Sequence, residues 1–132
     1  MTQSFTYNKT EKLKSRKQLD IVFKNGKSFL VFPLKVFVIF EEVMQENKIQ
    51  CGVGVSKKHF SKAVDRNRIK RMLRENYRLN KAALHKTITA KQLSFFILYI
   101  DKVMPDKSNL LDDKMKKVME KICLKYQDEQ AS

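Results

Sequence analysis

The chain has 132 residues, 42% of them hydrophobic and 10% aromatic, which is enough for one folded domain and too short for two. Its 28 Lys and Arg residues outnumber 14 Asp and Glu, and the formal net charge is +14. Such an excess indicates a polyanionic partner, because Lys and Arg displace counterions condensed on a phosphate backbone. The lack of Trp, of an apolar run near the ~18 residues of a spanning helix and of a signal-peptide pattern predicts a cytoplasmic protein without a membrane partner.

The basic residues are concentrated in one part of the sequence. Residues 57–91 contain twelve basic and two acidic residues, whereas residues 92–132 contain seven of each. Residues 1–40 are moderately basic, with eight basic and two acidic residues. We therefore expect a phosphate-binding surface to come mainly from the middle of the chain.

The first ordered element is predicted to be a helix between Ser15 and Gly26. Ser15 and Gln18 have the spacing of a capping box at its start. Leu19 and Phe23 recur at helical spacing on one stripe. Gly26 suits a left-handed residue that ends the helix.

Three segments are predicted to be β-strands. Residues 33–44 have a period of two, with one apolar face and a second face that is apolar in part. Residues 49–56 form a second strand, and its two glycines suggest close approach of another backbone or a ligand. A turn at residues 45–48 favours a hairpin, which would make these two strands antiparallel. Residues 93–100 are apolar almost throughout, which is typical of a central strand covered on both sides.

Two further helices follow from the 3.6-residue period. Residues 64–84 combine a core face with a cationic face about 100° wide. That cationic face contains Lys70, Arg71, Arg74, Arg78 and Lys81. Ser108 can cap a last helix, whose apolar stripe consists of Leu111, Met115, Val118 and Ile122. Residues 127–132 are expected to fray.

The motif Arg66-Asn67-Arg68 stands where the long helix begins. Free backbone N–H groups at a helix N-terminus already favour phosphate, and Arg matches phosphate with two parallel hydrogen bonds. Asn can hydrogen-bond a base edge or a ribose hydroxyl. Only Asp65 and Glu75 oppose the cations between residues 56 and 81. The pattern therefore favours a phosphate-binding surface over a merely solvated one.

At this point the sequence shows a resemblance. The run AVDRNRIKRMLRENYR, preceded by GVGVSKK, resembles the signature of the bacterial ribonuclease P protein family, and the similarity extends over about residues 12–125. It implies an α+β fold, a two-layer α/β sandwich with a mixed sheet of about four strands in the order αβββαβα. It also implies one domain over residues 1–132 with flexible termini, and a left-handed crossover, against the usual right-handed rule.

The resemblance implies a function in which the protein is not the catalyst. The chain would be the protein subunit of a ribonucleoprotein endoribonuclease, a hydrolase that removes the 5′ leader from precursor tRNA. Its partners would be the catalytic RNA subunit and precursor tRNA, and the protein itself would be monomeric. Mg²⁺ is expected on the RNA, so we expect no catalytic residue and no metal or cofactor ligand in this chain.

Carried over position by position, the resemblance implies two RNA-binding sites. The surface for the catalytic RNA comprises Lys57, Lys58, Arg66, Asn67, Arg68, Lys70 and Arg71. The charge pattern adds Lys62, Arg74 and Arg78 as further RNA-binding residues. The cleft for the leader comprises Leu19, Phe23, Phe37 and Val38. Leu19 departs from the family pattern, which often has an aromatic residue there. The alignment of the first strand leaves the choice between Phe37 and Val38 open.

The residues themselves leave simpler interpretations open. Phe23 and Phe37 fit a hydrophobic core as well as a stacking role. His59 and His85 have no neighbouring nucleophile or carboxylate pattern, so we expect both on the surface. The two cysteines are far apart without nearby His ligands, which predicts reduced thiols and no zinc site.

Other functional classes remain as alternatives. A ribosomal or other structural RNA-binding protein can share this composition and even this fold, and only the arginine-rich motif separates it. A DNA-binding helix-turn-helix needs two short helices joined by a tight turn, whereas here the cationic helix follows a strand. No carboxylate pair suggests a protein-only nuclease. A solvated hairpin edge is favoured over a cation site for Glu41, Glu42 and Glu46.

Overall fold

The computed structural model describes residues 12–13, 15–42, 49–105 and 108–131. The elements in chain order are α1 (Arg16–Asn25), β1 (Lys27–Val31), β2 (Leu34–Glu42), β3 (Ile49–Val55), α2 (Ala63–Asn80), α3 (Ala82–Thr87), β4 (Lys91–Tyr99) and α4 (Ser108–Ala131). The α+β class and the order αβββαβα are thus confirmed, with the short helix α3 added. The predicted turn at residues 45–48 lies outside the described residues.

The four strands form one mixed sheet in the order β1-β2-β4-β3. β1 and β4 both pair antiparallel with β2, whereas β3 pairs parallel with β4. The predicted antiparallel hairpin between residues 33–44 and 49–56 is therefore wrong, because β4 lies between those two strands. Residues 93–100 were predicted to form a central strand, and β4 does lie between two other strands. A strand that is apolar on both faces buries the most surface in that position.

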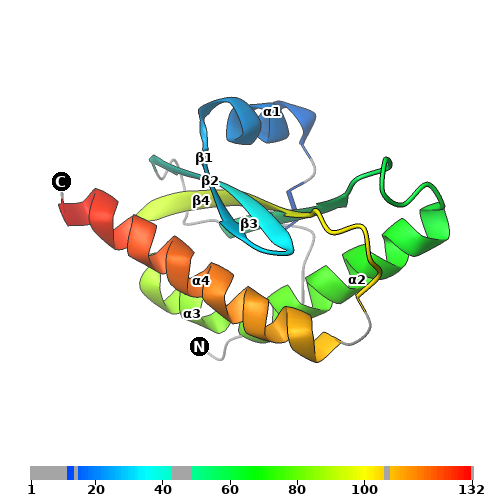
Figure 1. Cartoon of the computed structure of the whole chain (residues 1–132). Coiled ribbons are helices and arrows are strands. Elements are labelled where there is room, and N and C mark those ends of the chain that lie inside the picture. The colour runs from blue at the N-terminus through cyan, green and yellow to red at the C-terminus, as the bar shows by residue number, and fades with distance from the viewer. Residues whose placement is uncertain (1–11, 14, 43–48, 106–107, 132) are drawn as a thin grey trace.

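The helices cover both faces of the sheet (Figure 1). α2, α3 and α4 lie on one face, and the sheet with these helices forms the two predicted layers. α1 lies on the other face, where it contacts β2 and β4. Among the helices in the described part of the chain, it alone lies on that face, and it covers only part of it.

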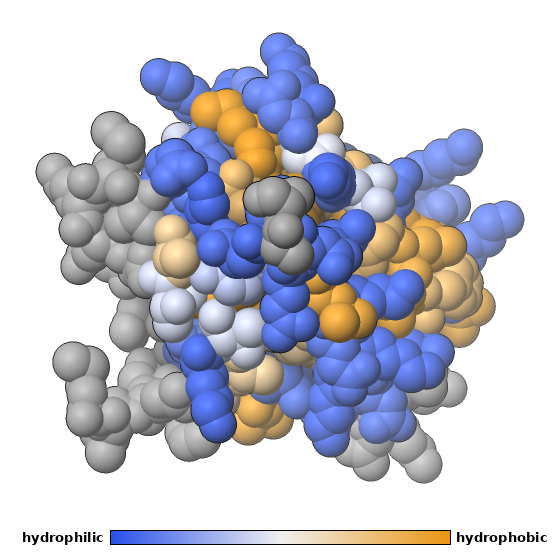
Figure 2. All heavy atoms as spheres, turned by 90° about the vertical axis from the view of Figure 1, so that its left-hand side faces the viewer, coloured by the Kyte–Doolittle hydropathy of each residue, from blue (hydrophilic) through white to orange (hydrophobic). Residues whose placement is uncertain are grey.

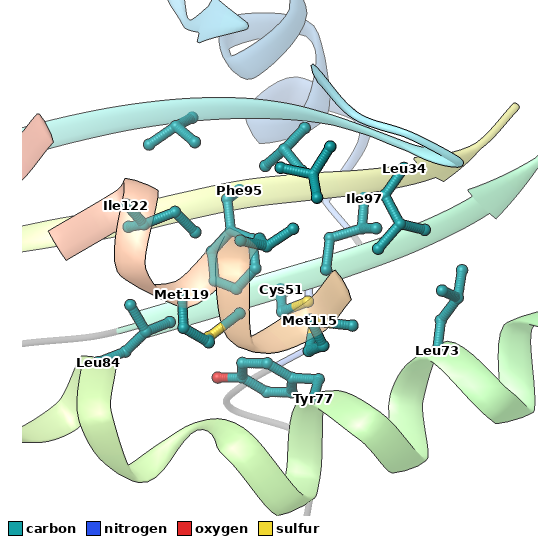
Figure 3. Packing of buried hydrophobic residues seen from close by; sticks show 14 of the residues in the cluster. Leu34, Cys51, Leu73, Tyr77, Leu84, Phe95, Ile97, Met115, Met119 and Ile122 are labelled. Atoms are coloured by element: carbon teal, nitrogen blue, oxygen red, sulfur yellow. The ribbon is translucent and has the colours of Figure 1, made fainter. Parts of the chain in front are cut away.

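The main core lies between the sheet and the helices α2 and α4 (Figure 3). Alternate residues of each strand point into it, as Phe95 and Ile97 do from β4. The ring of Tyr77 on α2 lies edge-on to Phe95, with centroids 5.6 Å apart. Burial of such side chains stabilises the fold by about 1.5–3 kcal/mol each, and it fixes which face of α2 points outward.

The ends of α1 differ in part from their predicted chemistry. Ser15 caps the helix by accepting a hydrogen bond from the Gln18 backbone N–H at 3.3 Å. The Gln18 amide donates instead to the sheet, to Glu41 Oε1 at 2.6 Å and Ser94 Oγ at 3.1 Å. Gly26 has φ −75°, so the predicted left-handed stop is wrong. Glycine fits there because a Cβ would lie 2.4 Å from a backbone oxygen of α1.

The two C-terminal helices also differ from prediction. The single helix predicted over residues 64–84 is broken at Lys81, and α3 carries the buried Leu84 into the core. α4 begins at Ser108 as predicted but continues to Ala131, so the predicted fraying from residue 127 is wrong. Near its end the Tyr126 hydroxyl accepts a hydrogen bond from the Ala90 N–H at 3.0 Å, which holds the last turns against the domain.

Candidate nucleic-acid interface

The core contacts of α2 turn its cationic side outward. Ile69, Leu73 and Tyr77 are fully buried on one side of the helix. Arg71 and Arg74 lie on other sides of it and are exposed to solvent. The predicted contact residues that are exposed are Lys57, Lys58, Lys62, Asn67, Arg68, Arg71 and Arg74. Those that are partly exposed are Arg66, Lys70 and Arg78. All ten therefore present some surface, and we call them the arginine-rich surface.

Arg66 has a structural task within this surface. Its Nη1 donates to the backbone oxygens of Phe60 at 2.8 Å and Ser61 at 2.7 Å. These bonds tie the first turn of α2 to the loop between β3 and α2, which carries Lys57 and Lys58. Arg66 thus fixes the position of neighbouring cations as well as contributing charge.

The charge of the surface is reduced at its C-terminal end. Arg78 pairs with Glu75 one turn earlier, and this pair raises the pKa of the Arg78 guanidinium and lowers the pKa of the Glu75 carboxyl. Lys81, which we predicted on the cationic face, is only 4% exposed. The strongest uncompensated charge therefore lies in the first two thirds of α2 and in the loop before it.

A cluster of three aromatic rings lies on the opposite face of the sheet, beside α1. The Phe23 ring is edge-on to Phe37 and to Phe96, with centroid distances of 5.0 Å and 5.1 Å. Phe37 and Phe96 are directly paired across β2 and β4. Phe23 remains 44% exposed, so it is not a core residue. We call Phe23, Phe37 and Phe96 the aromatic cluster.

The structure decides between the two candidates on β2. Phe37 faces α1, whereas Val38 is 2% exposed and belongs to the core on the α2 side. The prediction of Val38 as a cleft residue is therefore wrong, because neighbouring strand residues point to opposite faces. Leu19 lies on α1 and is partly exposed, as a cleft residue needs to be.

Phe96 was missing from the predicted cleft. It lies beside β3, where a Cβ at Gly52 would be 2.8 Å from its Cδ2 atom. The two glycines of β3 do mark a close approach, but the group that approaches is this side-chain ring and not the backbone or ligand that was predicted. The two glycines in the sequence indicate that a bulky group lies against β3. They identify Phe96 as that group only when β3 is known to pair with β4.

The remaining polar candidates have ordinary environments. His59 is partly exposed and His85 exposed, as predicted. Glu41 accepts a hydrogen bond from Gln18, Glu42 pairs with Lys91, and Glu46 lies outside the described residues. Across the described ranges, His, Cys, Asp and Glu form no group of three or more able to hold a metal ion, and neither Cys51 nor Cys123 is in a disulfide there. None of the helices in those ranges is long and apolar enough to cross a membrane.

Fold and site together define a small basic α+β protein with an arginine-rich surface on one side of its sheet and an aromatic cluster on the other. The family model for ribonuclease P matches residues 7–123. The ribonuclease P protein component of Porphyromonas gingivalis is 37% identical over 97 residues, 74% of this chain and 71% of that protein. That of Legionella pneumophila is 31% identical over 126 residues, 92% of this chain and 97% of that protein.

Solved structures agree with this assignment. The RNase P protein of Staphylococcus aureus has a TM-score of 0.63 at 25% identity, over 85% of this chain and 94% of that chain. The RNase P protein of Thermotoga maritima, at 23% identity, shows the same fold with a TM-score of 0.65, over 84% of this chain and 96% of that chain. The chain belongs to the ribonuclease P protein family.

Proposed function

We propose that this chain is the protein subunit of a ribonuclease P that removes the 5′ leader from precursor tRNA together with a catalytic RNA. Membership of the family implies a subunit of a ribonucleoprotein endoribonuclease and an RNA subunit as partner. The protein binds both the catalytic RNA and the leader, and it acts as a monomer in the cytoplasm. Cleavage of the phosphodiester is the work of Mg²⁺ ions held by the RNA.

The observation that carries the proposal is the presence of two chemically different surfaces on opposite faces of one sheet. The arginine-rich surface offers charge and bidentate donors, which suit the phosphates of a folded RNA. The aromatic cluster offers ring edges and faces, with the Lys35 ammonium 5.4 Å from the Phe37 ring centroid. Aromatic rings beside cations suit a single strand, whose bases stack while its phosphates meet the cations.

Each surface has a separate task in this proposal. Arg68, Arg71 and Arg74 neutralise phosphates of the catalytic RNA, which lowers the repulsion between that RNA and its equally anionic substrate. Phe23 and Phe37 hold leader bases on the far side of the sheet, so the protein binds precursor tRNA more tightly than mature tRNA. The sheet lies between the two surfaces and so holds the catalytic RNA and the leader at a fixed distance from each other.

Reconstitution with the cognate catalytic RNA tests the proposal. The purified protein alone should leave precursor tRNA intact, and adding it to the catalytic RNA should restore cleavage at low Mg²⁺ concentration. Robust cleavage by RNA-free protein would contradict an RNA-borne active site. Tight RNA binding without any gain in cleavage would instead assign the chain to structural RNA-binding proteins, the alternative class.

A further inference from the structure

The lysines of α4 are sorted onto one side of the helix. Residues 92–132 have no net charge, but at roughly 100° per residue four lysines of α4 fall within an arc about 80° wide. They are Lys114, Lys117, Lys121 and Lys125, and we call them the lysine stripe. The stripe is about 16 Å long. A segment that is neutral in sequence therefore presents a one-sided positive surface.

This stripe lies beside β1, away from α2 and α3. The Lys121 and Lys125 ammonium groups are 5.8 Å and 5.6 Å from the centroid of the Phe29 ring on β1. The opposite flank of α4 faces α2, where Asp112 accepts a hydrogen bond from Asn80 at 2.8 Å. The lysine stripe and the arginine-rich surface are thus separate surfaces.

The stripe's charges are not compensated within the described residues. No carboxylate there lies within 4.0 Å of any of its four ammonium groups, whereas Lys116, on another side of α4, pairs with Asp112. Asp128 shares the arc only beyond the last lysine. Asp128 and Glu129 line one cavity with Lys125, so negative charge lies at that end of the stripe. Four neighbouring cations without an ion pair favour a polyanion, since each bound phosphate releases condensed counterions.

A continuous route leads from the aromatic cluster to the stripe. Lys35 lies next to the Phe37 ring, and Leu30 of β1 is paired with Lys35 and is 55% exposed. β1 is an edge strand of the sheet, and the lysine stripe lies beyond it. Figure 2 shows a hydrophobic patch bordered by hydrophilic side chains on the side that carries β1 and α4.

The hairpin between β1 and β2 adds an aromatic side chain to this route. Phe32 follows β1 directly and is 56% exposed. β1 runs antiparallel to α4, as the ribbons in Figure 1 show, and Phe29 in the middle of β1 lies near Lys121 and Lys125. Phe32 is therefore toward the N-terminal end of the stripe. An exposed ring beside a row of cations suits single-stranded RNA.

We propose that the part of the 5′ leader farther from the cleavage site passes over the β1 edge and lies along the lysine stripe. This inference rests on the proposed function, which puts the nearer part of the leader on the aromatic cluster. The occupant is single-stranded RNA, because the route combines exposed apolar side chains with spaced lysines. The stripe makes affinity depend on leader length.

The experiment compares precursor tRNAs with leaders of about 4 and about 12 nucleotides, lengths that span the usual sites for single strands. The holoenzyme carries either wild-type protein or K117Q/K121Q. The matched control is K86Q/K102Q, which removes the same charge at two exposed lysines outside the stripe. A second variant, K114Q/K117Q, leaves the contact between Lys121 and Phe29 intact. Melting temperatures verify that each variant is folded.

We expect K117Q/K121Q to weaken binding of the long-leader substrate about 3- to 10-fold and to reduce its salt slope by about 1.4, at 0.7 per phosphate of a single strand. K114Q/K117Q should act similarly. Short-leader binding and the control should stay within about twofold. Equal losses for both leaders would assign the stripe to the catalytic RNA and overturn the inference alone. Wild-type binding that ignores the leader altogether would overturn the proposed function as well.

Discussion

The Phe96 ring lies so close to Gly54 that a Cβ at this glycine would come within 2.6 Å of the ring Cζ atom. Gly52, two residues earlier on the same strand, faces the other end of the ring in the same way. The missing side chains of β3 thus form a recess in which Phe96 lies flat enough to meet Phe23. The aromatic cluster therefore requires glycine at positions 52 and 54, because any side chain there would occupy the space of the Phe96 ring.

Gly54→Ala should destabilise the protein and disturb the aromatic cluster. The added methyl group forces the Phe96 ring to move, and overpacking of this kind costs about 1–3 kcal/mol. In urea unfolding, G54A/F96L should lose less stability than the sum of the two single variants, because leucine removes the clashing ring atoms. Strictly additive losses would show that the ring and the glycine do not interact.

Asp112 links α4 to α2 and should make stability depend on pH. The Asn80 amide, and then the Lys116 ammonium, hold the pKa of the Asp112 carboxyl below its ordinary value. A lowered pKa stabilises the fold at pH above the ordinary value of about 3.9, and this contribution is lost as the pH falls through the folded-state pKa. D112N should therefore cost about 0.5–1 kcal/mol at pH 7, because the side chain is partly exposed. At pH 2 its unfolding curve should approach that of the wild type.

Local patterns were sufficient to predict which face of α2 points outward, although Lys81, which was assigned to that face, is buried. Periodicity alone distinguishes the face of Ile69 and Leu73 from the face of Arg71 and Arg74, because a helix repeats every 3.6 residues whatever it packs against. The role of Arg66 could not be predicted in this way. Its bonds to two backbone oxygens depend on the conformation of the preceding loop.

The aromatic cluster was only partly predictable, for a physical reason. In β4 both faces are apolar, so alternation cannot tell that Phe95 enters the core while Phe96 faces α1. The sequence also could not decide between Phe37 and Val38. The alignment of that strand was uncertain by one or two positions, and a shift of one residue moves every side chain to the opposite face of the sheet. Pairing of β3 with β4 is a contact between distant segments, and no local signal in residues 49–56 specifies it.

Phe23→Ala should reduce binding of precursor tRNA and leave mature tRNA almost unaffected. If Phe23 stacks a leader base, its loss should weaken precursor binding about tenfold, or about 1.4 kcal/mol, within the range for one stacked base. The stability loss should be smaller than the 3–5 kcal/mol typical of a buried Phe, because the ring is partly exposed. Phe23→Leu, which keeps apolar area but no ring, should also weaken precursor binding. Equal losses for precursor and mature tRNA would contradict a leader contact.

Arg71→Ala and Arg66→Ala should separate the two tasks within the arginine-rich surface. Arg71 is exposed and has the outward position on α2, so its removal should reduce the salt slope for the catalytic RNA by about one and leave the melting temperature unchanged. Arg66 holds the loop before α2 through its bonds to Phe60 and Ser61. Its removal should cost about 1–3 kcal/mol of stability and should also weaken RNA binding, because the loop lysines lose their fixed positions.

Arg66→Lys is the informative control for this pair of variants. Lysine keeps the charge, but its side chain is one bond shorter and lacks the planar guanidinium, so its nitrogen does not reach the position from which Arg66 Nη1 donates to two backbone oxygens. We therefore expect R66K to lose stability nearly as R66A does, while retaining most of the salt slope measured by titrating the catalytic RNA at several salt concentrations. An R66K protein as stable as the wild type would mean that Arg66 contributes charge alone. An unchanged salt slope for the catalytic RNA in R71A would mean that this side of α2 does not contact the RNA.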